Sequence, residues 1–286
     1  MQHVRIKQAA EPGPGELAAG HARDAWLRAL ADFDPTRAET IKHDARSGVH
    51  RARMHGRDVI VKVASLASLA DGLKHALRAS QAWRQWRGAE RLRRAGVDVA
   101  ACLTLASART ADGRPVEVLL LEAIAGEHVL QHLAGVLTIE RERAIAAGIG
   151  LGLAHMLDQG LANRDHKLSN LIVAADAGDP GGCRVVIVDS VAIRRIGAAS
   201  RPAALTRMLA DMLVEALGCG VPVRLALRRR LVREYLRAVW HAHEGDSGNR
   251  VEFEEWELGS ARAIWRRVDE AIRGRPIGPP RVSPLR

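Results

Sequence analysis

The chain has 286 residues, 47% of them apolar and 27% charged, so it can bury one large core or two smaller ones. Its 43 basic residues against 33 acidic ones favour anionic partners: nucleotides, phosphorylated sugars, nucleic acid or an anionic membrane surface. Three widely spaced cysteines form neither a disulfide framework nor a CxxC metal pair, so we expect a reducing, cytoplasmic setting. The N-terminus lacks the apolar core of a signal peptide. The sequence has no run of about 18 apolar residues, so no transmembrane helix is predicted.

The first half of the chain is predicted to be strands with two helices. Residues 1–15 end in EPGPG and are expected to be a flexible lead-in. Strand-like runs then alternate with turn signals, and two segments carry apolar residues at helical spacing. The predicted helices are residues 21–33 and 71–95, and the predicted strands lie within 47–64, 101–108 and 115–124.

Helices dominate the second half. Thr138 is a predicted N-cap, acidic residues follow it in the first turn, and Gly160 lies just past the predicted end of that helix. A small β-rich part is therefore followed by a larger helical part. Two strands are predicted at residues 170–174 and 184–189, helices at 202–217, 224–240 and 252–273, and a Pro-rich tail after them.

The stretch LANRDHKLSNLIVA, Leu161 to Ala174, carries the strongest chemical signal. It joins a helix to a strand, so its side chains can point into a cleft while the backbone is held at both ends. Asp165 could accept a proton from an attacking hydroxyl. Asn170 begins one predicted strand and Asp189 ends the next, so hairpin pairing would bring their oxygens together as a site suited to Mg²⁺. Taken alone, Asp165 and Asn170 could also be ordinary turn residues.

A second signal is Lys62, which lies among the β-branched apolar residues of VIVKV. An ammonium group with its stem along a buried strand needs an anion beside it. That anion could be a phosphate or a helix carboxylate, and Glu90 in GAERLRRAG is the best candidate. The alternative is an edge-strand lysine that points to water.

Together these features resemble the protein-kinase-like superfamily. The chain has a strand lysine, a helix glutamate, an R-D-x-K-x-x-N loop and a strand-ending aspartate, in the order found in that superfamily. The catalytic loop of the superfamily reads H-R-D-L-x-x-x-N. Three further segments resemble the lipopolysaccharide core kinases, the Kdo and heptose kinase group. These segments are RSGVHRARMHGRDVIVKV, AERLRRAGVDVA and LLLEAIAGEHVLQHL.

The resemblance implies a bilobal α+β fold with a small β-rich N-lobe and a larger helical C-lobe. The expected parts are an N-terminal extension with one helix at residues 1–39, an N-lobe at 40–123, a C-lobe at 124–275 and a tail at 276–286.

It also implies an ATP- and Mg²⁺-dependent phosphotransferase. Asp165 would be the catalytic base, and Lys167 would neutralise the transferring γ-phosphate. The remaining implied roles concern the nucleotide and metal: Asn170 and Asp189 for Mg²⁺, Lys62 with Glu90 for the α- and β-phosphates, Gly48 in the loop over the phosphates, and the backbone around Glu122 and Ile124 for adenine.

Three departures from the family pattern keep other functions open. Asn163 stands where the family has His, Ser190-Val191 follows the metal aspartate in place of Phe-Gly, and Gly48 is not part of a G-x-G-x-x-G loop. The alternatives are a catalytically inactive, kinase-shaped nucleotide-binding scaffold and a protein Ser/Thr kinase.

The resemblance implies an anionic glycolipid or sugar of the lipopolysaccharide type as the acceptor. We expect a cytoplasmic protein, with peripheral contact to the cytoplasmic face of the inner membrane as an open alternative. The arginine-rich helix 224–240 is predicted to be an ordinary solvated surface, with a docking face for an anionic acceptor as the second interpretation. Nucleic acid is not a predicted partner, because no RRM, helix-turn-helix or zinc-finger pattern is present.

Three glycines in AGIGLGLA (Gly148, Gly150 and Gly152) invite a dinucleotide-binding interpretation. They lie inside a helical pattern and do not follow a strand, and the GxGxxG spacing is not met. Close helix packing is the prediction for this segment.

Overall fold

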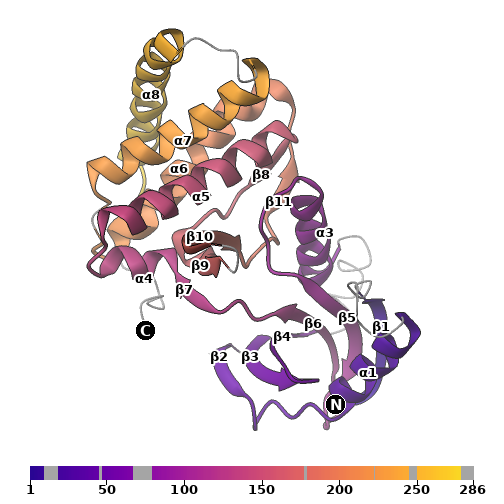
Figure 1. Ribbon diagram of the computed structural model, residues 1–286. Coiled ribbons are helices and arrows are strands. Elements are labelled where there is room, and N and C mark those ends of the chain that lie inside the picture. The colour runs from indigo at the N-terminus through magenta and orange to yellow at the C-terminus, as the bar shows by residue number, and fades with distance from the viewer. Residues whose placement is uncertain are drawn as a thin grey trace. The chain divides into compact units, whose positions relative to one another are not determined.

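The computed structural model describes residues 1–9, 19–44, 47–66, 79–176, 179–221, 223–244 and 250–277. The chain divides into two compact units, drawn in Figure 1. The first unit is Met1–Ala89 with Ala100–Ala123, and the second is Glu90–Val99 with Ile124–Arg286.

The first unit is built on an antiparallel six-stranded sheet with the order β1-β5-β6-β4-β3-β2. Its strands are β1 (Gln2–Ala9), β2 (Glu39–His43), β3 (Ser47–Met54), β4 (Arg57–Ser65), β5 (Cys102–Arg109) and β6 (Pro115–Glu122). Helix α1 (Ala19–Ala31) also belongs to this unit, as does helix α3 (Gln81–Arg94) up to Ala89.

The two faces of strand β4 have different neighbours. Side chains alternate across a strand, so Val59 and Val61 share one face and Lys62 points from the other. The valine face packs with Leu30 and Phe33, at and beyond the end of α1, in one buried cluster. The core of the first unit therefore lies on the α1 side of the sheet, and Lys62 is on the opposite side.

The N-terminal segment is a strand, so the expectation of a flexible lead-in is wrong for residues 2–9. Strand β1 pairs antiparallel with β5 at the edge of the sheet. Ile6 is buried, and the Lys7 Nζ lies 2.9 Å from Oε1 of the buried Glu117. The alternation of Val4 and Ile6 with basic residues is the pattern of a half-buried strand, and it outweighs the Pro/Gly signal that follows it.

A two-residue turn connects β3 to β4. His55 and Gly56 have φ angles of 51° and 75°. Positive φ at both central residues is the type I′ geometry whose twist matches a two-residue hairpin. This turn fixes the register in which Val49 lies opposite Lys62.

The second unit is mainly helical, with two small sheets of order β10-β9-β7 and β11-β8. Its main helices are α4 (Val129–Ala134), α5 (Ile139–Asp158), α6 (Arg201–Gly218), α7 (Leu225–Glu244) and α8 (Arg250–Arg273). Its strands are β7 (Gly126–His128), β8 (Leu161–Asn163), β9 (Leu171–Asp176), β10 (Asp179–Ile187) and β11 (Ile193–Arg195), with short 3₁₀ helices η1 (Leu168–Asn170) and η2 (Ala198–Ser200).

Helix ends follow the predicted signals closely. The Thr138 hydroxyl accepts a hydrogen bond from the Arg141 amide at 3.2 Å, as an N-cap should. Gly160, with φ of 63°, follows the C-cap of α5. Within the predicted helix 71–95, the structure describes α3 from Gln81, and residues 71–78 lie outside the described residues. The predicted tail is likewise described only as far as Ile277.

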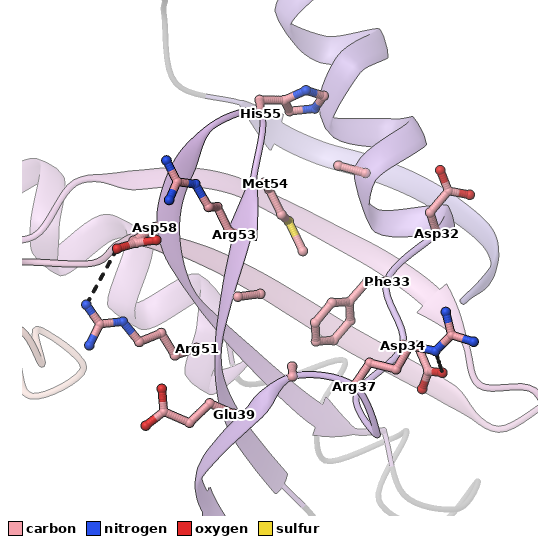
Figure 2. Close-up of a pocket in the computed structure, with 13 residues that line it drawn as sticks. Asp32, Phe33, Asp34, Arg37, Glu39, Arg51, Arg53, Met54, His55 and Asp58 are labelled. Carbon is pink, nitrogen blue, oxygen red and sulfur yellow. Dashed lines mark ion pairs between the residues drawn. The ribbon is translucent and has the colours of Figure 1, made fainter.

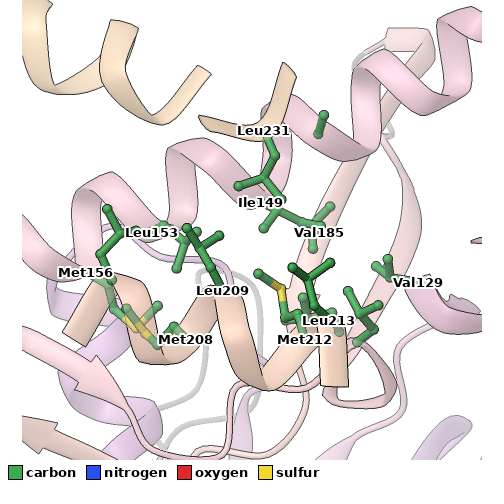
Figure 3. Close-up of a cluster of buried hydrophobic side chains, with 14 of the residues drawn as sticks. Val129, Ile149, Leu153, Met156, Val185, Met208, Leu209, Met212, Leu213 and Leu231 are labelled. Carbon is green, nitrogen blue, oxygen red and sulfur yellow. The ribbon is translucent and has the colours of Figure 1, made fainter. Parts of the chain in front are cut away.

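Helices α5, α6 and α7 and the β9–β10 hairpin enclose the core of the second unit. Figure 3 shows aliphatic and methionine side chains from these elements converging. A Cβ atom on Gly148 would lie 2.7 Å from Val185 Cγ2, and one on Gly150 would lie 2.8 Å from backbone atoms of α7. The predicted close packing is therefore confirmed for these two glycines. Among the described residues, no helix combines the length and apolarity needed to cross a membrane.

Candidate active site

The stretch that carries Asp165 is held at both ends by backbone pairing. Strand β8 pairs antiparallel with β11, and the Arg164 amide donates to the Ala192 carbonyl at 3.2 Å. On the other side, η1 leads directly into β9. Asp165 therefore lies on a short loop whose two exits are fixed, and its carboxylate remains half exposed.

Asp165 and Lys167 form the closest charged pair of this loop. Lys167 Nζ lies 2.6 Å from Asp165 Oδ1. Partial burial opposes the charged form of Lys167, but the hydrogen bond and charge of Asp165, with smaller contributions from Glu215 and Asp211, outweigh burial and raise its pKa. A permanently positive ammonium therefore stands beside a carboxylate on a surface open to solvent.

The β9–β10 hairpin brings Asn170 and Asp189 to one end, as the sequence predicts. Leu171 pairs with Ile187, and the Val188 amide donates to the Asn170 carbonyl at 2.9 Å. The Asn170 side chain also reaches back, because its Nδ2 donates to the Asp165 carbonyl oxygen at 3.0 Å. Three of the four predicted residues on this part of the chain are thus linked directly, and Asp189 follows the paired Val188.

The oxygens of this group suit a magnesium ion. Because Asn170 Nδ2 donates to Asp165, the Oδ1 of Asn170 points away from that carbonyl. The Oδ1 of Asp189 accepts from the Val191 amide at 3.0 Å. Across the described residues, no three or more His, Cys, Asp or Glu side chains lie together in a way that could hold a metal ion. Magnesium usually takes only one or two carboxylates and completes its shell with waters and substrate phosphates, so the donors present fit it.

Glu215 is a part of this site that sequence reasoning missed. Its carboxylate on α6 accepts from the Ser169 amide at 3.0 Å and from the Ser169 hydroxyl at 2.5 Å. Ser169 immediately precedes Asn170, so α6 fixes the backbone from which that amide projects. The signal in the sequence was a carboxylate inside the apolar run MLADMLVEALG, where a charge needs a partner.

Two buried polar residues flank Asp165. Asn163 is 1% exposed, and its Oδ1 accepts from the Asp165 amide at 3.0 Å, so it braces the loop at the position where the family pattern has His. His166 is 3% exposed, and burial lowers its pKa to about 4 although Asp165 opposes this. His166 is therefore neutral near pH 7.

Lys62 is paired with an amide. The sequence predicted Glu90 as its partner, but Lys62 Nζ donates to Gln85 Oε1 at 2.9 Å, and Glu90 forms an ion pair with Arg94 on its own helix. Five residues separate Gln85 from Glu90, which places them about 140° apart around the helix. Gln85 lies in the buried stripe of α3 with Ala82, Ala89 and Leu92, whereas Glu90 is partly exposed.

The other predicted nucleotide contacts lie on or beside the sheet. Gly48 is in β3, and the Asp44 carboxylate accepts from the amide of the preceding Ser47 at 2.8 Å. A Cβ on Gly48 would lie 2.6 Å from His50 Nε2, so the imidazole occupies the space beside this glycine. Glu122 ends β6 and Ile124 begins the second unit, so the predicted adenine segment is the connection between the units.

A pocket of about 630 Å³ lies in the first unit, and none of the predicted site residues lines it. Figure 2 shows Phe33 and Met54 beside it, with charged side chains around the rim. Arg51 and Asp58 lie 3.7 Å apart, and Arg37 and Asp34 lie 3.5 Å apart. Two of the arginines in the lining are thus each paired with an aspartate of the lining, and we assign no ligand to this pocket.

Comparison with protein-family models and with curated proteins finds no match. Solved structures do match, among them WaaP in complex with acyl carrier protein, at 16% identity and a TM-score of 0.51 over 80% of this chain and 89% of that chain. The chain therefore has the bilobal, protein-kinase-like α+β fold that its sequence predicts.

Proposed function

We propose that the chain is a phosphotransferase that uses ATP and Mg²⁺ to phosphorylate a hydroxyl group. The observation that carries this proposal is the grouping of Asp165, Lys167 and Asn170 on one braced loop, with Lys167 2.6 Å and the Asn170 amide 3.0 Å from Asp165 atoms. Phosphoryl transfer needs positioned charge more than covalent chemistry, and this loop supplies it.

In this proposal each side chain has a separate task. Asp165 orients the acceptor hydroxyl and takes its proton as the oxygen bonds to the γ-phosphorus and ADP departs. Lys167, which its raised pKa keeps protonated, offsets the charge on the transferring phosphoryl group. Asn170 and Asp189 would hold Mg²⁺, which when bound offsets phosphate charge.

The first unit would supply the nucleotide contacts. If the edge strand β1 is set aside, Lys62 is on the third strand, where protein kinases carry the lysine that binds the α- and β-phosphates. The turn before Gly48 would cover the phosphates, and the backbone at Glu122 and Ile124 would contact adenine. Gln85 would hold Lys62 in place of a glutamate.

We assign the acceptor to the sugars of a lipopolysaccharide-type glycolipid. This rests on the segments that resemble the Kdo and heptose kinases, on the fold shared with WaaP, and on a formal net charge of +10 that suits an anionic acceptor. The acceptor would be reached from the cytoplasmic face of the inner membrane by peripheral contact.

An inactive nucleotide-binding scaffold is the second candidate. Glu90, the predicted partner of Lys62, pairs with Arg94 in its own helix, and Ser190-Val191 replaces Phe-Gly after Asp189. A scaffold of this kind would bind Mg-ATP without transferring phosphate.

One experiment separates these functions. The purified chain is incubated with Mg²⁺ and γ-labelled ATP, and with either dephosphorylated lipopolysaccharide core oligosaccharide or a mixture of proteins. We expect label in the oligosaccharide. Label only in protein would favour a Ser/Thr kinase, and saturable ATP binding with no labelled product would favour the scaffold.

A further inference from the structure

Behind the catalytic loop, the second unit contains a pocket of about 260 Å³ that the proposed reaction does not use. Its walls come from α5, from the β9–β10 hairpin and from residues 96–98. Half of the lining residues are aliphatic or thioether, and four of these are labelled in Figure 3: Ile149, Leu153, Met156 and Val185. An interior of this kind favours an apolar occupant.

His166 also lines this pocket. Its side chain is 3% exposed, and within the described part of the chain neither ring nitrogen has a hydrogen-bond partner. Buried polar groups are almost always paired, so an unpaired imidazole facing a pocket indicates that something else completes its bonds. A neutral imidazole offers one donor nitrogen and one acceptor nitrogen, and a hydroxyl group can pair with either of them.

The third glycine of AGIGLGLA gives an independent indication. Gly148 and Gly150 are explained by close packing against Val185 and α7, but a Cβ on Gly152 would meet nothing within 4 Å. Gly152 lines the same pocket. Glycine disfavours a helix interior, so a glycine that packing does not require, placed on the pocket wall, preserves open space there.

We infer that this pocket is a binding site for a small, uncharged molecule with an aliphatic body and one hydroxyl group that pairs with His166. The walls accept the body, His166 pairs with the polar group, and Gly152 leaves open space at the pocket wall. An anionic ligand is disfavoured because Arg184, the one arginine or lysine among the described lining residues, is exposed and lies 3.6 Å from Asp98. The inference does not depend on kinase activity.

Hexan-1-ol is a suitable probe, with hexanoate as its charged counterpart. The full chain is titrated with each and followed by NMR of the methyl groups of Ile149, Leu153 and Val185. We expect saturable shifts with hexan-1-ol and binding of hexanoate weaker by about tenfold or more. Linear shifts without saturation, or equal affinity for the two probes, would overturn the inference.

Two variants locate the site. Gly152→Leu should weaken hexan-1-ol binding by about tenfold or more, because the new side chain fills the pocket. Gly259→Leu is the matched control, since Gly259 lies in α8, where a Cβ added to it would meet nothing within 4 Å, and it should bind as the wild type does. His166→Leu, which keeps the apolar wall, should weaken binding about fivefold. Unchanged affinity in both pocket variants would contradict the assignment, and His166→Leu alone decides it if Gly152→Leu does not fold.

Discussion

Lys62 is a single side chain of the first unit whose position is fixed by a buried hydrogen bond. Its ammonium group leaves the sheet on the face opposite Val59 and Val61 and meets Gln85 at 2.9 Å. Gln85 is 2% exposed, so this hydrogen bond forms away from bulk water. The uncharged amide oxygen accepts from the ammonium and helps to orient it without itself adding a negative charge.

Gln85→Ala should therefore destabilise the first unit. The change removes a buried acceptor from the Lys62 ammonium, which costs about 1–3 kcal/mol in the free energy of unfolding. Chemical denaturation measures this cost, and Gln81→Ala, at an exposed position of the same helix, is the control with an effect within about 0.5 kcal/mol. Equal effects of the two substitutions would show that the contact with Lys62 contributes nothing.

Among the elements, the loop from Asp165 to Asn170 is positioned by its neighbours more than by its own sequence. Strand β11 fixes its start, the hairpin fixes its end, and Glu215 of α6 holds Ser169, the residue before that end. Bonds to an ionised carboxylate are among the stronger hydrogen bonds in proteins. Helix α6 is thus the element on which the geometry of Asn170 depends.

A double-mutant cycle tests this dependence. Glu215→Gln should raise the Mg²⁺ concentration needed for half-maximal ATP turnover, because the backbone beside Asn170 loses a charged acceptor. Ser169→Ala should have a smaller effect in the same direction. When the shifts in half-maximal Mg²⁺ concentration are converted to free energies, the effect of the double variant should differ from the sum of the single effects by about 1 kcal/mol or more. The reason is that both changes remove the same interaction. Strict additivity would mean that Glu215 and Ser169 act independently.

The sequence predicted elements and local pairing well, and long-range side-chain partners poorly. The positions of Asn170 and Asp189 follow from a hairpin whose two strands are adjacent in the chain. The bonds of Ser169 to Glu215 and of Lys62 to Gln85 join side chains on elements that are not paired as a hairpin, and only the three-dimensional packing decides them. Strand β1 was missed because its short alternation lies next to a Pro/Gly-rich segment.

At the scale of the whole molecule, stability should depend on His166. Its pKa in the folded protein is about 4, below the ordinary value of 6.5. Between these values the unfolded chain binds a proton that the folded chain does not, so stability falls as the pH decreases from 6.5 towards 4. The loss from this group approaches about 3 kcal/mol.

Urea unfolding of the wild type and of His166→Leu between pH 7 and pH 4 measures this contribution. The variant should lose less stability over that range, because leucine binds no proton in either state. Parallel pH profiles for the two proteins would show that His166 is not held neutral by burial.

The central claim is that Asp165 acts as the base in phosphoryl transfer, and its most direct test is the turnover of Asp165→Asn with Mg-ATP and a core oligosaccharide. Turnover should fall by about 10²–10⁴-fold while Mg-ATP affinity stays near that of the wild type. Glu270→Gln, at an exposed position on α8, should keep full turnover as the control. Wild-type turnover in Asp165→Asn would contradict the account.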